Sequence, residues 1–142
     1  MSIRYFEDVE TDQELEPVEK IPTIEMAGGF GMARETPMGN RFTDAEASRE
    51  IGIQGALVPG PVKIAWLTKY VSDWAGTGAE IAGIRVAFRR PDVAGKPLVL
   101  SGRVVDKRVQ DGKSLVELEV VTLADGQPSV RANVQVRMPN RP

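Results

Sequence analysis

The clearest helical pattern in the chain lies between Pro61 and Ala75. Apolar residues recur there at the three- and four-residue spacing that places side chains on one helix face: Ile64, Leu67, Val71 and Trp74, widened by Val62, Ala65 and Ala75. Pro61 suits the first helical turn, where its missing N–H costs nothing, and Gly76 and Gly78 supply a stop. The pattern predicts a long helix over about 61–75 that is wrapped by other elements rather than merely docked on them.

After Gly78 the period of apolar residues changes to two, which is typical of β-strands. Apolar and polar positions alternate over 84–89 and 130–138, and 98–107 and 115–123 also have strand character. Asp111-Gly112 and Asp125-Gly126 are strong hairpin-turn signals. We therefore expect four antiparallel strands after one buried helix, which is an α+β fold with a meander.

The first third of the chain is less regular. An acidic stretch runs from Glu7 to Glu19, and residues 27–40, rich in Gly, Met and Pro, indicate a loop. The segment 43–46, Thr-Asp-Ala-Glu, has the form of a capping box and predicts a short helix over 44–51 that ends at Gly52. The tail after Met138 is expected to fray.

Composition narrows the function. The 142 residues suit one domain, 1–142, and they include neither cysteine nor histidine, so a metal site would need carboxylates alone and we expect no metal or cofactor. The net charge is −2, and the sequence contains no basic stripe, which argues against nucleic acid as a partner. No apolar run is long enough for a signal peptide or a membrane span, so we expect a cytoplasmic protein.

An ordered set of short segments resembles the MaoC-like dehydratase and (R)-specific enoyl-CoA hydratase family over nearly the whole chain. The segments are 5–9 with 12–15, which are similar to the family's first strand and turn, then 44–52, 56–60, 88–96 (Phe-Arg-Arg-Pro-Asp-Val-Ala-Gly-Lys) and 101–107. Segment 69–76 also resembles the small subunits of heteromeric hydratases that act on steroid side-chain enoyl-CoA esters. The resemblance implies a hot-dog fold, in which an antiparallel sheet wraps a long central helix. It also implies edge-to-edge dimers with the acyl site at the interface.

The family's catalytic pair is missing from this chain. In the family an Asp and a His, in the form Asp-x-Asn-Pro-x-His, hold the water that is added to the enoyl double bond. One alignment puts Pro37 and Phe42 at these two positions, and the other puts Arg34 and Gly39 there. Because the chain has no histidine, only the Asp half could be replaced, by Glu35 or Asp44. Hydratase chemistry by the family mechanism is therefore not available to this chain alone.

The resemblance implies that one part of the family site is kept. In the family a backbone N–H of the glycine that starts the central helix polarises the thioester carbonyl, and Gly60 matches this position. Alternatively Gly60 only starts the helix between two prolines. We expect the substrate-binding positions to be Val58 and Gly60 at this helix start, with Pro37, Asn40 and Phe42 near the lost catalytic pair. Phe42 would make that cavity dry.

Other candidates have structural explanations of their own. Three arginines, Arg85, Arg89 and Arg90, suit the phosphates of coenzyme A, but such residues more often form the solvated face of a strand. The carboxylates of Asp44, Glu46 and Glu50 could act as a base, yet Asp44 and Glu46 already have roles at a helix start. Trp74 fits the core better than an acyl pocket. The methionines at 26, 32 and 38 form either an adaptable surface or loop filler.

Three hypotheses of function follow. In the first, the chain is a catalytically degenerate subunit of an enoyl-CoA hydratase or dehydratase, and a second hot-dog subunit in a heterodimer supplies Asp and His. In the second, a homodimer is a self-sufficient thioesterase, isomerase or cyclase that uses a carboxylate. In the third, the chain is a non-enzymatic module that binds acyl-CoA or acts as a scaffold. The sequence leaves open whether the thioester carrier is coenzyme A or acyl carrier protein. The first is favoured, because loss of both catalytic residues in an otherwise family-like frame is what dependence on a partner would permit.

Overall fold

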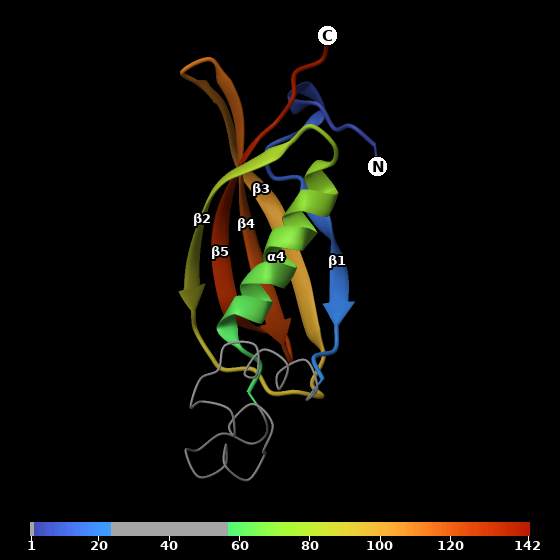
Figure 1. Cartoon of the computed structure of the whole chain (residues 1–142), viewed down its shortest axis with the longest axis vertical. Coiled ribbons are helices and arrows are strands. Elements are labelled where there is room, and N and C mark those ends of the chain that lie inside the picture. The colour runs from blue at the N-terminus through green and yellow to red at the C-terminus, as the bar shows by residue number, and fades with distance from the viewer. Residues whose placement is uncertain (1, 24–56) are drawn as a thin grey trace, which may run out of the picture.

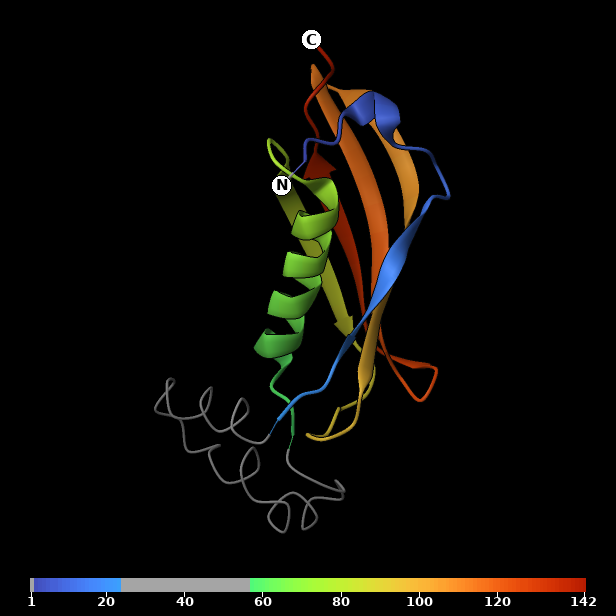
Figure 2. The same ribbon diagram turned by 90° about the vertical axis from the view of Figure 1, so that its right-hand side faces the viewer.

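One long helix lies across a five-stranded antiparallel sheet (Figures 1 and 2). The computed structural model describes residues 2–23 and 57–142. In chain order the elements are the 3-10 helix η1 (Phe6–Asp8), strand β1 (Glu14–Lys20), helix α4 (Gly60–Ala75), and strands β2 (Glu80–Phe88), β3 (Leu98–Gln110), β4 (Lys113–Ala124) and β5 (Gln127–Arg137). The α+β arrangement expected from the sequence is confirmed. The predicted loop over 27–40 and helix over 44–51 lie outside the described residues.

Helix α4 has the limits that its prolines and glycines predict. Pro59 is its N-cap and Pro61 lies in its first turn. At the other end, Gly76 takes a φ of 81°, and its amide donates to the Ser72 carbonyl at 3.0 Å. This left-handed conformation is favourable for glycine and stops the helix. The observed helix begins one residue before the predicted range of 61–75.

The buried face of α4 differs from the predicted one. Ile64 and Trp74 are only half-buried and Ala65 is exposed, whereas Lys63 and Tyr70 are buried beside Leu67, Val71 and Ala75. Two specific partners make this possible, since Asp92 pairs with the Lys63 ammonium and the Glu16 carbonyl accepts from the Tyr70 hydroxyl at 2.7 Å. A periodicity of apolar residues counts lysine as outward-facing, so it predicted a face that is rotated from the real one.

The strands follow the order β1-β3-β4-β5-β2. The meander β3–β4–β5 is confirmed, and both of its turns use Asp-Gly with positive φ at each residue: 52° and 76° at Asp111-Gly112, and 52° and 75° at Asp125-Gly126. These are the angles of the type I′ turns that match strand twist. Strand β2 crosses over to pair with β5, and β1 pairs with β3, so β1 and β2 form the two edges.

The core lies between α4 and the facing side of β3, β4 and β5. Its fully buried members on the sheet are largely valines and leucines that alternate with outward polar residues, as the period of two predicts. They include Leu98, Leu100, Val104, Val116, Leu118, Val120, Val130, Ala132, Val134 and Val136. Helix α4 packs against this face through Leu67, Tyr70, Val71 and Ala75.

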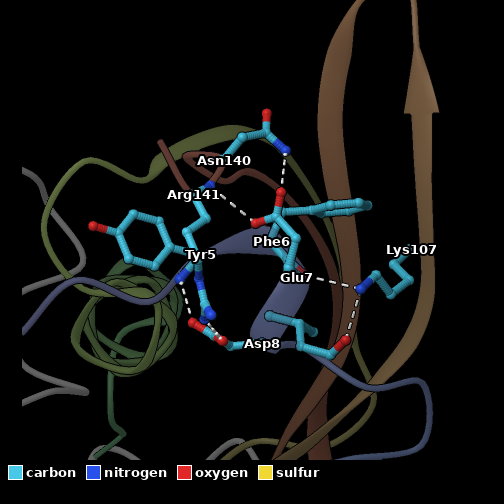
Figure 3. Close-up of polar contacts among 8 residues, drawn as sticks. Tyr5, Phe6, Glu7, Asp8, Lys107, Asn140 and Arg141 are labelled. Carbon is cyan, nitrogen blue, oxygen red and sulfur yellow. Dashed lines mark hydrogen bonds and ion pairs between the residues drawn. The ribbon is translucent and has the colours of Figure 1, made fainter.

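The N-terminal segment corrects the expected first strand. Residues 5–9 form η1 and a turn, and the strand begins only at Glu14, after Asp12 at a φ of 70°. Two contacts close the turn: the Tyr5 amide donates to the Asp8 carboxylate at 3.1 Å, and the Lys107 ammonium donates to the carbonyls of Phe6 and Val9 at 2.9 and 2.8 Å (Figure 3). The family-like segment therefore supplies a turn first and a strand second.

The C-terminal tail is held in place, contrary to the expected fraying. The Phe6 amide donates to the Pro139 carbonyl at 2.8 Å. The Glu7 carboxylate accepts from the Asn140 amide group and from the Arg141 backbone N–H, both at 3.0 Å, and Arg141 also pairs with Asp8 (Figure 3). These donors lower the pKa of Glu7, the Asn140 side chain being the largest cause. Both chain ends are thus fastened at one end of the sheet.

Candidate functional site

The N-terminal end of α4 is the candidate site. The Pro59 carbonyl accepts from the amides of Val62 and Lys63 at 3.1 and 3.4 Å, which closes the first turn. Pro59 and Pro61 have no N–H, so Gly60 supplies the one backbone donor of this turn that has no acceptor within the helix, and the helix dipole places partial positive charge there. This end of the helix is suited to polarise a carbonyl oxygen or to bind an anion.

The chain that leads into α4 is tied to the loop after β2. The Val58 amide donates to the Asp92 carbonyl at 2.8 Å, and Leu57 forms an isolated β-bridge with Val93. Val58 itself is 6% exposed. The start of the helix is therefore fixed relative to the sheet, as a site that positions a carbonyl oxygen requires.

A buried ion pair lies one turn into the helix. The Lys63 ammonium lies 3.0 Å from an Asp92 carboxylate oxygen, and both side chains are 3% exposed. We did not expect this pair from the sequence. A signal was present, because Lys63 lies four residues before Leu67 on the face that proves to be buried, but its partner in a loop 29 residues away could not be predicted from periodicity.

Phe88, at the end of β2, covers the same helix end. A Cβ added to Gly60 would lie 3.0 Å from one edge carbon of the Phe88 ring and 3.1 Å from the next. The Lys63 ammonium lies 5.8 Å from the centre of the ring, within the range of a cation–π contact. Phe88 is nevertheless 53% exposed. A glycine at position 60 thus permits the close approach of an aromatic ring that remains open to the outside.

Of the predicted site residues, the structure brings together Val58 and Gly60. Pro37, Asn40 and Phe42, and the candidate carboxylates Glu35 and Asp44, lie outside the described residues. No group of three or more acidic or other metal-ligating side chains that could hold a metal ion occurs in residues 2–23 and 57–142. The described part of the site therefore offers the backbone N–H at the start of α4 and an ion pair whose two charges neutralise each other.

Two of the three arginines considered for coenzyme A, Arg85 and Arg89, lie elsewhere. Arg85 pairs in register with Asn133, on the sheet face opposite the one that α4 covers. With Arg89 and Arg131 it lines a depression of about 350 Å³. Arg131 lies 3.6 Å from Glu119, whereas neither Arg85 nor Arg89 has a carboxylate partner within the described part of the chain. The structure brings these cations together, but on the side of the sheet away from Gly60.

A second concave surface lies between α4 and β1. This groove of about 320 Å³ is mostly apolar, and its lining includes Leu15, Val18, Trp66, Tyr70, Trp74 and Leu100 together with several charged residues. Trp74, which we expected in the core, packs against the core and also forms part of this wall, with the Arg4 guanidinium 4.7 Å from its ring centre. Burial, and next the Glu16 charge, raise the pKa of Tyr70 to about 12.

Comparisons with known proteins identify the fold. No protein-family model matches the chain, and no curated protein sequence matches it. Solved structures do match. A MaoC-like dehydratase from Rhodospirillum rubrum is 18% identical with a TM-score of 0.81, and the match covers 98% of this chain and 99% of that one.

Two further structures are similar. An (R)-hydratase from A. caviae involved in PHA biosynthesis is 16% identical with a TM-score of 0.79, over 92% of this chain and 98% of that one. A chain of the ChsH1-ChsH2 complex from Mycobacterium tuberculosis is 22% identical with a TM-score of 0.77, over 91% and 98%. The chain thus has the hot-dog fold, as its resemblance to MaoC-like proteins implied, and its structural neighbours include both hydratases and a complex of two different subunits.

None of the helices in the described part of the chain is both long and apolar enough to span a membrane.

Proposed function

We propose that this chain is a partner-dependent subunit of a hydratase or dehydratase that acts on acyl thioesters of coenzyme A or acyl carrier protein. The observation that carries the proposal is the complete absence of histidine from a chain with a hydratase-like fold. Hydration of an enoyl thioester requires a base that takes a proton from water and an acid that protonates the α-carbon. A second hot-dog chain would supply both groups, as an Asp and a His.

This chain's part in the reaction would be to stabilise charge. When water oxygen bonds to the β-carbon, the electron pair of the double bond moves toward the thioester carbonyl, whose oxygen becomes negative. The Gly60 amide, at the positive end of α4, would donate to that oxygen. The Val58 amide donates to the Asp92 carbonyl, which fixes the chain just before the helix, so the Gly60 amide would be held in place before the substrate binds.

The second candidate is a self-sufficient enzyme of different chemistry, such as a thioesterase, an isomerase or a cyclase. The preserved start of α4 favours it, because a helix N-terminus stabilises the oxyanion of any acyl transfer. It needs a free carboxylate, and Asp92 is not one, since the Lys63 ammonium lies 3.0 Å away and both groups are buried. Glu35 and Asp44 remain the residues to test for this hypothesis.

The third candidate, a binding module without chemistry, rests on the apolar groove between α4 and β1. Its size, about 320 Å³, is at the lower end of typical small-molecule sites. This hypothesis predicts binding of an acyl thioester by the isolated chain, with no turnover and no obligatory partner.

A tagged pull-down from the native host at moderate salt, followed by native mass spectrometry, separates the three. Equal amounts of this chain and a second hot-dog chain with an intact Asp and His, together active on a trans-2-enoyl-CoA, would support the first proposal. A homodimer that turns over thioesters, and loses activity when Glu35 or Asp44 is changed to the amide, would support the second. A protein that binds acyl-CoA without turnover and without a partner would support the third.

A further inference from the structure

Strand β2 is an edge strand with an apolar and a basic side. Within the described residues it pairs only with β5, so the N–H and C=O groups along its other edge are free to pair with another strand (Figure 1). Ile84 and Phe88 are opposite the buried residues Val134 and Val130, hence on the side of α4, yet they are 39% and 53% exposed. Exposed large apolar side chains on an open edge are typical of a site of strand addition.

The opposite side of the same edge carries two arginines, and the one carboxylate that lines the depression beside them, Glu119, is paired with Arg131 at 3.6 Å. Arg85 and Arg89 are exposed there, separated by Ala87, and neither has a carboxylate partner among residues 2–23 and 57–142. The acidic residue on β2 is Glu80, at the other end of the strand, and it is paired with Arg137 at 2.7 Å. The edge therefore presents two arginines on one face and no nearby acid on the same strand to offset them.

This charge pattern works against pairing with a second copy of the chain. In a two-fold symmetric antiparallel pair, if residue i lies opposite j, then j lies opposite i. Consider registers centred between Ile84 and Arg89 that keep both apolar sides together. Each of them brings an arginine at 85 or 89 directly opposite, or diagonally next to, an arginine at 85 or 89 of the other copy. Like charges at these cross-strand distances, about 5 to 8 Å, are unfavourable.

We propose that the β2 edge selects a different hot-dog chain, one whose edge strand has carboxylates at the positions facing Arg85 and Arg89. This inference rests on the proposed function and adds the residues that determine the choice of partner. Ile84 and Phe88 supply apolar contact that either a second copy or another chain could make. Arg85 and Arg89 supply the discrimination, because specificity needs an interaction that disfavours the wrong partner.

The chain itself provides the probe. The double variant Arg85→Glu/Arg89→Glu carries acidic groups at the positions where the proposed partner would have them. Mixed with the wild-type chain, it should form a mixed dimer about tenfold tighter than the wild-type homodimer, as measured by fluorescence-detected sedimentation. Raising the salt from about 0.1 M to 1 M, which shortens the screening length from roughly 10 Å to 3 Å, should remove the preference. The neutral variant Arg85→Gln/Arg89→Gln should self-associate more tightly than the wild type.

A matched control reverses two cations away from β2, in Arg103→Glu/Lys113→Glu, and should give no mixed-dimer preference. If wild type and the β2 variant show no preference for each other, or do not associate, the inference is overturned. The proposed function fails separately. A pull-down that recovers a competent hot-dog partner while the charge swap has no effect rejects only the inference, whereas a clear charge preference without any hydratase partner rejects only the function.

Discussion

Gly60 lies where the backbone of α4 and the ring of Phe88 meet. In Gly60→Ala the new methyl group would lie about 3.0 Å from the ring, so the half-exposed ring must shift by a few tenths of an ångström. We expect the free energy of unfolding to change by less than about 1 kcal/mol, since alanine suits a helix. Turnover by the proposed complex with a catalytic hot-dog partner should fall roughly 10- to 100-fold, because the new methyl group would obstruct the approach of the thioester to the amide.

Steady-state kinetics of the complex and thermal melts of the variant measure the two effects. The double variant Gly60→Ala/Phe88→Leu gives the methyl group room, and Phe88→Leu alone is its control. If Gly60→Ala loses no more turnover than its loss of folding stability accounts for, Gly60 has only a packing role at the helix start.

Lys63 and Asp92 depend on each other because both are buried. Lys63→Met leaves the buried Asp92 carboxylate without its partner, and Asp92→Asn leaves the buried Lys63 ammonium without its partner. Each single change should therefore lower the free energy of unfolding by about 3–5 kcal/mol. The double variant Lys63→Met/Asp92→Asn removes both charges and should recover most of that loss. Urea denaturation at neutral pH measures all three. A loss in the double variant equal to the sum of the single losses would contradict the coupling.

Tyr70 gives the fold a dependence on alkaline pH. Its pKa is raised from 10.0 to about 12, chiefly by burial, so the folded state retains the proton more strongly than the unfolded state. The stability contributed by the protonated Tyr70 is fully present below about pH 10. As the pH rises toward 12, the free energy of unfolding falls by on the order of 2 kcal/mol. Tyr70→Phe should lose about 1 kcal/mol at neutral pH with the hydrogen bond to Glu16, but lack this alkaline loss.

Absorbance titration of Tyr5→Phe, which leaves Tyr70 as the single tyrosine of the chain, measures the pKa directly. A midpoint near 10 in the folded protein would show that the hydroxyl is in contact with water.

At the scale of elements, the tail and η1 act as one unit through Glu7. The pKa of Glu7 is lowered from 4.5, chiefly by the hydrogen bond from the Asn140 side chain. The ionised Glu7 carboxylate therefore stabilises the folded tail above pH 4.5, and this stabilisation is lost as the pH falls through the lowered pKa. Hydrogen-exchange protection of the Phe6 and Arg141 amides should therefore fall in acid. Glu7→Gln should show weak protection already at neutral pH. Glu10→Gln is a control on the same segment. If it behaves like Glu7→Gln, the attachment of the tail to η1 has another cause.

Elements with local causes could be predicted from the sequence. Asp-Gly turns and the Pro61-to-Gly76 helix follow from the φ angles that these residues adopt, and they were found where expected. The pairing of β2 with β5, the buried face of α4 and the fixed tail could not be predicted, because each depends on a partner that is distant in sequence. Asp92 for Lys63 and Glu7 for Arg141 are examples, 29 and 134 residues away.

The candidate site was predictable to the same extent. Gly60 and Val58 could be placed because a proline-flanked glycine before an apolar helix has a strong local signature. Phe88 and the Lys63–Asp92 pair were missed as parts of the site, since only the fold brings the end of β2 against the start of α4. What the sequence decided without any structure was a matter of chemistry: a chain without histidine cannot contain the family's catalytic pair.

At the scale of the whole molecule, the proposed function makes activity a property of an assembly of this chain with a second hot-dog chain. The isolated chain should not hydrate a trans-2-enoyl-CoA above the buffer rate, whereas the complex with its hot-dog partner should. Changing the partner's catalytic Asp or His should reduce turnover by at least about 100-fold, since general acid–base catalysis contributes that much. Glu35→Gln and Asp44→Asn in this chain should leave it within about twofold, because they would take no part in proton transfer. Loss of activity in either of these variants, with the complex intact by native mass spectrometry, would instead assign a catalytic carboxylate to this chain.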